Sequence, residues 1–133
     1  MTDSIQKIHT FFMFTGQAEA AMNYYISLFN NSKIIDISYY GANEEGSEGT
    51  VRLARFALKG QEFLCIDSSI SHAFTFTPSI SLYVTCENEA EIDSCFAALS
   101  QKGVVLMPLG VYPFSQKFAW VQDKFGVSWQ LTL

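Results

Sequence analysis

The sequence has few positively charged residues and no long hydrophobic run. Lysine and arginine together number 8 and are scattered along the chain, so the basic stripe that typically binds nucleic acid is missing. No apolar run approaches the roughly 18 residues that a membrane-spanning helix needs. The first residues, 1–7, are polar and lack the apolar segment of a signal peptide. Neither nucleic-acid binding nor membrane insertion is expected.

Cysteine is also scarce, with 3 residues at Cys65, Cys86 and Cys95. The number is odd, and the spacing matches neither a CxxC pair nor a zinc finger. These residues therefore indicate reduced thiols in a cytoplasmic protein rather than a disulfide framework.

Apolar and aromatic residues, by contrast, are plentiful. Of the 133 residues, 49% are hydrophobic and 12 are phenylalanine, while only 16% are charged. This composition argues against disorder, and the length suits a single domain with its own core. The phenylalanines are numerous for so small a core, so we expect some aromatic rings to line a binding site or an interface.

The hydrophobic pattern indicates a strand, a helix and three strands, and this order then occurs a second time. The sequence therefore predicts an internal repeat. The first half predicts a strand over 8–14, a helix over 17–29, and strands over 33–40, 50–58 and 62–67, with a tight turn at Lys59-Gly60. The second half predicts a strand over 79–85, a helix capped by Asn88 and Glu91 and ended by a left-handed Gly103, and strands over 104–109, 116–122 and 127–133. The prediction is one α+β domain of two βαβββ modules, 8–67 and 79–133, joined by a linker over 68–78.

Two stretches resemble a known family. The first is F-T-G-Q-A-E-A-A-M-N-Y-Y-I-S-L-F, residues 14–29, and the second is the ending D-x-F-G-x-x-W-Q-L, residues 123–131. Both are similar to the PhnB-like branch of the vicinal-oxygen-chelate (glyoxalase/bleomycin-resistance/dioxygenase) superfamily, as is the middle segment F-T-P-S-I-S-L-Y-V. The resemblance implies that the two modules form a curved mixed sheet around a cavity, in a homodimer.

Many members of this superfamily hold a divalent metal ion with His, Glu or Gln side chains from the first and last strands of the modules. By this resemblance the metal ligands would be His9 and Gln130, although Thr10 aligns as well as His9, and Asp67 could serve as a further oxygen ligand. The opening strand of the second module has no histidine near Ser79, which leaves the ligand set incomplete for zinc.

Alternation along the last strand places Ser128 and Gln130 on one face, which is either solvated or the wall of a polar cavity. The resemblance favours the cavity wall, with Trp120 stacking on a planar ligand. We therefore expect a small-molecule-binding protein whose site contains His9, Asp67, Trp120, Ser128 and Gln130.

Two other functions stay open. One is a metal-dependent lyase, isomerase or dioxygenase, and the other is a non-catalytic structural or regulatory dimer. The sequence does not identify a catalytic side chain. The PhnB-like branch has often been labelled demethylubiquinone methyltransferase, but no glycine-rich strand-to-helix turn that would hold S-adenosylmethionine or a nucleotide occurs here. Residues 108–115 form either a lid over the cavity or a plain hairpin loop.

Overall fold

The computed structural model describes residues 5–133. The chain divides into two compact units, residues 1–71 and 72–133, and each is described by itself. The first unit contains β1 (Thr10–Phe14), α1 (Ala18–Leu28), β2 (Lys33–Tyr39), β3 (Val51–Leu58) and β4 (Gln61–Asp67). The second contains β5 (Ser81–Thr85), α2 (Glu89–Leu99), β6 (Val104–Tyr112), β7 (Ser115–Gln122) and β8 (Ser128–Thr132).

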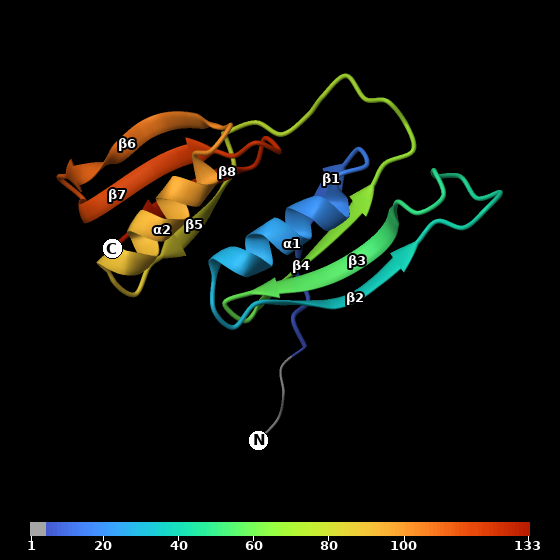
Figure 1. The fold of residues 1–133 in the computed structure, drawn as a ribbon, viewed down its shortest axis with the longest axis horizontal. Helices are drawn as coiled ribbons and strands as arrows, with labels where there is room; N and C mark the ends of the chain where they lie inside the picture. The colour runs from blue at the N-terminus through green and yellow to red at the C-terminus, as the bar shows by residue number, and fades with distance from the viewer. Residues whose placement is uncertain (1–4) are drawn as a thin grey trace. The chain divides into compact units, whose positions relative to one another are not determined.

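The two units share one topology. In the first, the strand order is β1-β4-β3-β2, and in the second it is β5-β8-β7-β6. The opening strand runs parallel to the closing strand of its own unit, and the other neighbours are antiparallel. In each unit the helix lies across one face of the sheet (Figure 1). The predicted α+β fold with two βαβββ modules is confirmed.

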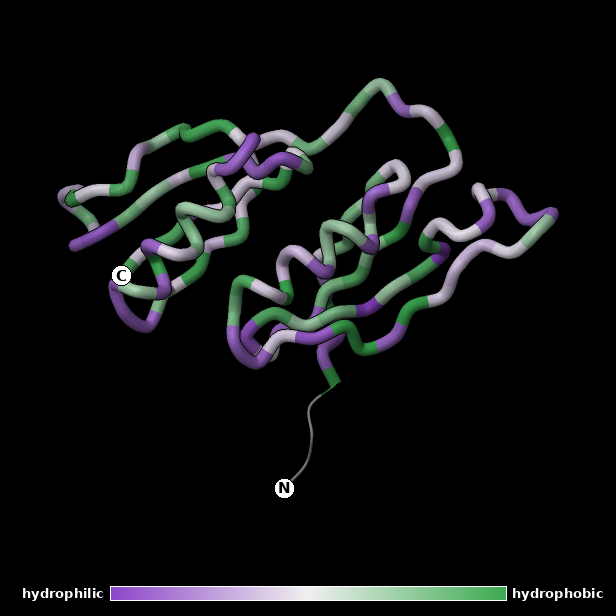
Figure 2. Tube along the Cα trace, viewed as in Figure 1, coloured by the Kyte–Doolittle hydropathy of each residue, from purple (hydrophilic) through white to green (hydrophobic). Residues whose placement is uncertain are grey.

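Side-chain alternation decides which face of each sheet forms the core. In the first unit, the residues on the α1 side are buried, and their rings pack closely, with the centroids of Phe56 and Phe63 5.4 Å apart. In the second unit, Trp129 and Leu131 of β8 are at most 1% exposed on the α2 side. Figure 2 shows the corresponding alternation of hydrophobic and hydrophilic residues along the strands. Each sheet therefore has one core face and one helix-free face.

Most predicted turns are where the sequence placed them. Lys59 and Gly60 both have positive φ, as a two-residue hairpin turn of type I′ requires. Asn88 is the N-cap of α2, and its side chain accepts a hydrogen bond from the Glu91 N–H at 2.8 Å.

One prediction needs correction, and the strand predicted over 104–109 is longer than expected. The left-handed residue after α2 is Lys102, with φ 59°, and not Gly103. Gly103 is needed for space, because a Cβ atom there would collide with the carbonyl oxygen of Gln122 and lie 3.0 Å from that of Leu99. The segment 108–115 is largely strand, since β6 continues to Tyr112 and β7 begins at Ser115. It is a hairpin with a short connection, and Pro108 is tolerated because β6 is an edge strand.

Within the part of the chain that the structure describes, neither helix is long and apolar enough to span a bilayer.

Candidate functional site

The helix-free face of the second unit carries a continuous row of side chains from all four strands. The register pairs Tyr83 of β5 with Gln130 of β8, Gln130 with Trp120 of β7, and Trp120 with Met107 of β6. Paired residues project to the same side of a sheet, so an amide lies between two aromatic side chains. Tyr83 is 59% exposed, which leaves much of its ring available for contact with a ligand.

The neighbouring row contains Ser81 and Ser128, which are hydrogen-bonded to each other and to Trp120 and Gln130 of the first row. The hydroxyl oxygens of Ser81 and Ser128 are 2.6 Å apart, and the Trp120 indole Nε1–H donates to Ser128 Oγ at 2.9 Å. The Gln130 Nε2 group reaches Ser81 Oγ at 3.4 Å. Ser128 is 1% exposed, so its hydroxyl depends on Ser81 and Trp120 rather than on water for its hydrogen bonds. We call Ser81, Trp120, Ser128 and Gln130 the polar cluster.

The helix-free face of the first unit differs because it is charged at one end. His9 Nε2 lies 3.6 Å from Glu62 Oε1, and Arg55 Nη1 lies 3.6 Å from the same oxygen. Arg55 Nη2 also donates to Asp36 Oδ2 at 2.8 Å, and this hydrogen bond raises the pKa of the guanidinium. Phe11 and Leu53 lie further along this face and are about half exposed. The predicted residue His9 precedes β1 and belongs to this charge network.

Asp67 has its carboxylate engaged by the backbone. Its Oδ1 accepts hydrogen bonds from the N–H groups of Gly16 at 2.7 Å and Ala18 at 3.0 Å, at the start of α1. Its Oδ2 accepts the Val51 N–H at 2.9 Å, where β3 begins. The residue is 3% exposed and lies on the α1 side of its sheet. These contacts give Asp67 a structural role at the junction of β4, α1 and β3.

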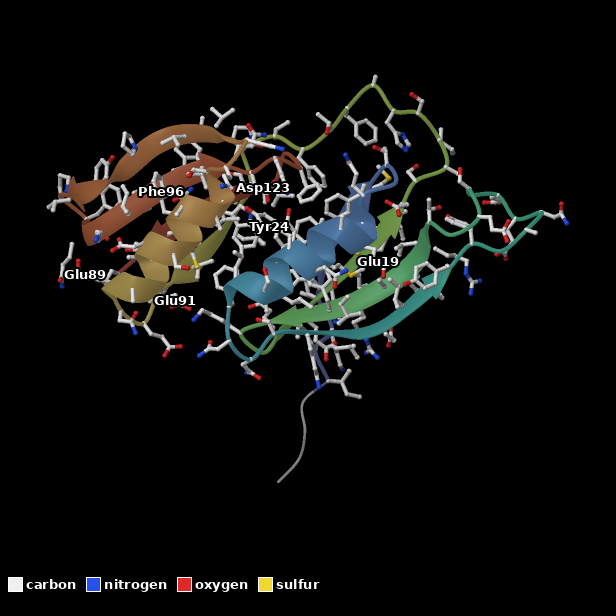
Figure 3. The ribbon with its side chains drawn as sticks, in the orientation of Figure 1. Glu19, Tyr24, Glu89, Glu91, Phe96 and Asp123 are labelled. Carbon is white, nitrogen blue, oxygen red and sulfur yellow. The ribbon has the colours of Figure 1, made fainter. Side chains whose placement is uncertain are left out.

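Asp123 has the corresponding role in the second unit (Figure 3). Its Oδ1 accepts from the N–H groups of Phe125 at 2.8 Å and Val127 at 3.1 Å, and its Oδ2 accepts from the Trp129 indole at 2.8 Å. Gly126 has φ 97°, a left-handed conformation that side chains rarely adopt. The D-x-F-G-x-x-W sequence is therefore a turn organised around one carboxylate.

Cys65 does not offer a reactive thiolate. It is fully buried in the first unit, and desolvation, with the nearby charge of Asp67, raises the pKa of its thiol to about 12. At neutral pH the group is an uncharged thiol, which is a poor nucleophile and a poor metal ligand.

The predicted metal ligands lie in surroundings that do not favour a cation. His9 and Glu62 are two side chains that could bind a divalent cation, but the Arg55 guanidinium beside Glu62 would repel it. Across residues 5–133 no group of three or more His, Cys, Asp or Glu side chains is arranged to hold a metal ion. Gln130, the other predicted ligand, has the Ser81 hydroxyl as a hydrogen-bond partner and Tyr83 and Trp120 as its cross-strand neighbours.

At the turns that lead into the helices, side chains of this chain occupy several backbone N–H groups. In the first unit the N–H groups of Gly16 and Ala18 already donate to Asp67, and in the second the Asn88 side chain caps α2. Cofactors with anionic or nucleotide groups are commonly bound by free N–H groups at such turns. Here this chain's own side chains take those positions.

Of the five predicted site residues, the structure brings three together, namely Trp120, Ser128 and Gln130. His9 and Asp67 belong to the other unit. Sequence reasoning missed Ser81, Tyr83 and Glu62, although the alternation of S-L-Y-V-T in β5 places Ser81 and Tyr83 on one face and apolar residues on the other.

Comparison with known proteins gives a consistent family. The sequence profile of a family described as 3-demethylubiquinone-9 3-methyltransferase matches residues 6–132. None of the curated proteins matches the chain. A PhnB protein from Bacillus cereus, for which the same methyltransferase description is provisional, is 64% identical over 96% of this chain and 99% of its own, with a TM-score of 0.95.

More distant structures share the fold. A glyoxylase/bleomycin resistance protein/dioxygenase domain from Frankia is 12% identical over 98% of this chain and 93% of its own, with a TM-score of 0.65. The fosfomycin resistance protein FosX from Listeria monocytogenes, solved with Mn(II) and a dihydroxypropylphosphonic acid, is also 12% identical, over 97% and 93%, with a TM-score of 0.63. More distant relatives thus share only the fold, whereas the chain itself belongs to the PhnB-like family described as 3-demethylubiquinone-9 3-methyltransferase.

Proposed function

We propose that this protein binds a small organic molecule on the helix-free face of its second unit. The observation that carries the proposal is the polar cluster, in which Ser128 Oγ contacts both the Trp120 indole and Ser81. A merely solvated sheet face has no need of side chains that position one another in this way. Fixed polar groups beside aromatic rings are typical of a site that orients a ligand.

The row of Tyr83, Gln130 and Trp120 supports a planar ligand. Neighbouring strands are about 4.8 Å apart, so the two aromatic residues flank the amide at a spacing that suits a ring system lying across the sheet. The aromatic surfaces would supply most of the affinity, and the amide and hydroxyl groups would supply orientation.

The family description names a methyltransferase, but the strand-to-helix turns favour binding over methyl transfer. The N–H groups of Gly16 and Ala18 are engaged by Asp67. We propose that the protein acts as a cytoplasmic homodimer, the state that the family resemblance implies. A ligand-binding role for His9 and Asp67 stays a prediction, and the hydrogen bonds of Asp67 favour a structural role for that residue.

Replacing Trp120 with leucine is expected to weaken ligand binding roughly tenfold, because the stacking surface and the donor to Ser128 are both lost. The ligand is found by screening uncharged planar fragments for an increase in Tm, and the Kd of the best fragment is measured by calorimetry. The control is Phe96→Leu, which removes an aromatic ring from α2 on the opposite side of the same sheet. The proposal fails if no fragment binds, or if Trp120→Leu binds as tightly as the unmodified protein.

The metal-dependent alternative predicts stoichiometric metal that His9→Ala removes. We expect no tight metal binding, because the Arg55 guanidinium lies 3.6 Å from the only carboxylate near His9 among the described residues. Elemental analysis after incubation with zinc, nickel, manganese or iron makes the test. Stoichiometric metal that His9→Ala or Gln130→Ala abolishes would establish the alternative and contradict our expectation.

A further inference from the structure

The polar cluster has a fixed direction of hydrogen bonding. The Trp120 indole can only donate, so Ser128 Oγ accepts from it at 2.9 Å. Ser128 is 1% exposed, and among the described residues the only acceptor within hydrogen-bonding distance of its own proton is Ser81 Oγ, at 2.6 Å. A buried hydroxyl that leaves its proton unpaired is costly. Ser128 therefore donates to Ser81.

Ser81 is the end of this chain of donors. Its oxygen accepts from Ser128 at 2.6 Å and, more weakly, from Gln130 Nε2 at 3.4 Å. With both lone pairs accepting, the proton of Ser81 is directed away from the cluster. Hydrogen bonds in series polarise one another, so the last hydroxyl is a stronger donor than an isolated serine. Ser81 is half-buried, and its proton is available to a ligand.

A second hydroxyl pair on the same face has the opposite direction. Ser115 Oγ donates to the Lys117 carbonyl oxygen at 2.8 Å, so in its 2.6 Å contact with Thr132 it is Thr132 that donates. Thr132 therefore has no proton to offer a ligand. Of the four hydroxyls in these two pairs, that of Ser81 is the one that offers its proton to a ligand.

The helix-free face of the second unit is also uncharged. Its side chains are Ser81, Tyr83, Thr85, Val104, Met107, Tyr112, Phe118, Trp120, Gln122, Ser128, Gln130 and Thr132. The nearest lysine along β7 is Lys117, which is on the α2 side and contacts Asp93 at 2.7 Å and Glu89 at 3.1 Å. A charged ligand would lose its hydration on this face and gain no counter-charge.

We propose that Ser81 is a specificity-determining donor and that the ligand is an uncharged planar carbonyl compound whose oxygen accepts the Ser81 proton. This inference rests on the proposed small-molecule function. It adds the chemical class of the ligand and a binding residue that alternation along the last strand does not reveal. An aromatic ketone would contact Trp120 and Tyr83 with its ring and Ser81 with its oxygen.

The test uses chromone, an uncharged bicyclic aromatic ketone, and its anionic derivative chromone-2-carboxylate. In titration calorimetry with this protein, chromone is expected to bind. The anion is expected to bind at least tenfold more weakly. Ser81→Ala should weaken chromone binding roughly five- to tenfold, the size expected for one hydrogen bond. Ser81→Thr should retain the affinity. Thr132→Val, which removes a different hydroxyl of this face, should leave the affinity unchanged.

Infrared spectroscopy separates a ligand contact from a purely structural role. The carbonyl stretch of bound chromone should shift to lower wavenumber in the unmodified protein and in Ser81→Thr, and this shift should be lost in Ser81→Ala. If Ser81→Ala does not fold, Ser81→Cys keeps the volume with a weaker donor and should give a smaller shift. Equal binding of chromone to the unmodified protein and to Ser81→Ala, or tighter binding of the anion, overturns the inference alone. Binding of other uncharged planar fragments but not chromone also overturns only the inference, whereas binding of none overturns the proposed function with it.

Discussion

Alanine in place of Asp67 is expected to lower the free energy of unfolding of the first unit by about 3 kcal/mol. The carboxylate accepts hydrogen bonds from Gly16, Ala18 and Val51, and alanine would leave these N–H groups without their acceptor. A hydrogen bond to a charged group contributes roughly 1.5–3 kcal/mol, and water can replace only part of this at a residue 3% exposed. Guanidinium denaturation followed by circular dichroism measures the change.

Asp36→Ala is the matched control for this prediction. Asp36 is also an aspartate with a close partner, Arg55 Nη2 at 2.8 Å, but both side chains are substantially exposed. Exposed ion pairs contribute little, so Asp36→Ala should leave the unfolding curve nearly unchanged. Asp67→Asn should be intermediate, because an amide keeps one acceptor oxygen but turns a donor toward a backbone N–H. A loss below roughly 1 kcal/mol in Asp67→Ala would contradict the structural role.

For Asp67, the sequence predicts the strand but not the hydrogen-bond partners. Its presence in a strand was predicted, but it was expected to contact a ligand, whereas it lies buried on the same face as Phe63 and Cys65. Its hydrogen-bond partners Gly16, Ala18 and Val51 precede it in the sequence by 51, 49 and 16 residues. No local sequence spacing therefore connects Asp67 with them. A carboxylate on the core side reads equally well as a ligand for a cation. Only the parallel pairing of β1 with β4 brings it to the start of α1.

The elements themselves were largely predictable, because each depends on local periodicity. The strand over 50–58 and the Lys59-Gly60 turn, for example, follow from alternation and from a glycine, which accepts positive φ. Gly103 was harder. A glycine after a helix usually supplies a left-handed residue, but here Lys102 does so, and Gly103 is required by the approach of β7 through the carbonyl of Gln122. That approach is a tertiary contact.

Three of the four members of the polar cluster were predicted from the sequence, and Ser81 was not. Ser128 and Gln130 alternate with Trp129 and Leu131, so their common face was predicted. Ser81 joins them because β5 pairs with β8 in parallel and in register, Ser81 opposite Ser128. Strand pairing between segments 47 residues apart is not encoded by either segment alone.

The second large effect is expected at Asp123, where alanine should lower the free energy of unfolding of the second unit by about 3–4 kcal/mol. Asp123 is 4% exposed and accepts from two backbone N–H groups, those of Phe125 and Val127, and from the Trp129 indole. Its loss would free the turn that contains Gly126 and leave a buried indole N–H unpaired. Urea denaturation followed by tryptophan fluorescence measures the change, because Trp129 reports the site directly.

A double-mutant cycle with Trp129→Phe separates the two functions of this carboxylate. Phenylalanine keeps most of the buried ring and removes the Nε1–H that lies 2.8 Å from Asp123 Oδ2. If the indole contact and the turn contribute separately, the coupling energy should be about 1–2 kcal/mol, and Asp123→Ala should remain strongly destabilising in the Trp129→Phe background. A coupling near zero would mean that the indole hydrogen bond adds nothing. If Asp123→Ala had no effect in the Trp129→Phe background, the backbone N–H groups would not depend on Asp123. The expected result, in contrast, explains why D-x-F-G-x-x-W requires both its first and last residues: the aspartate holds the turn, and the tryptophan anchors that turn in the core.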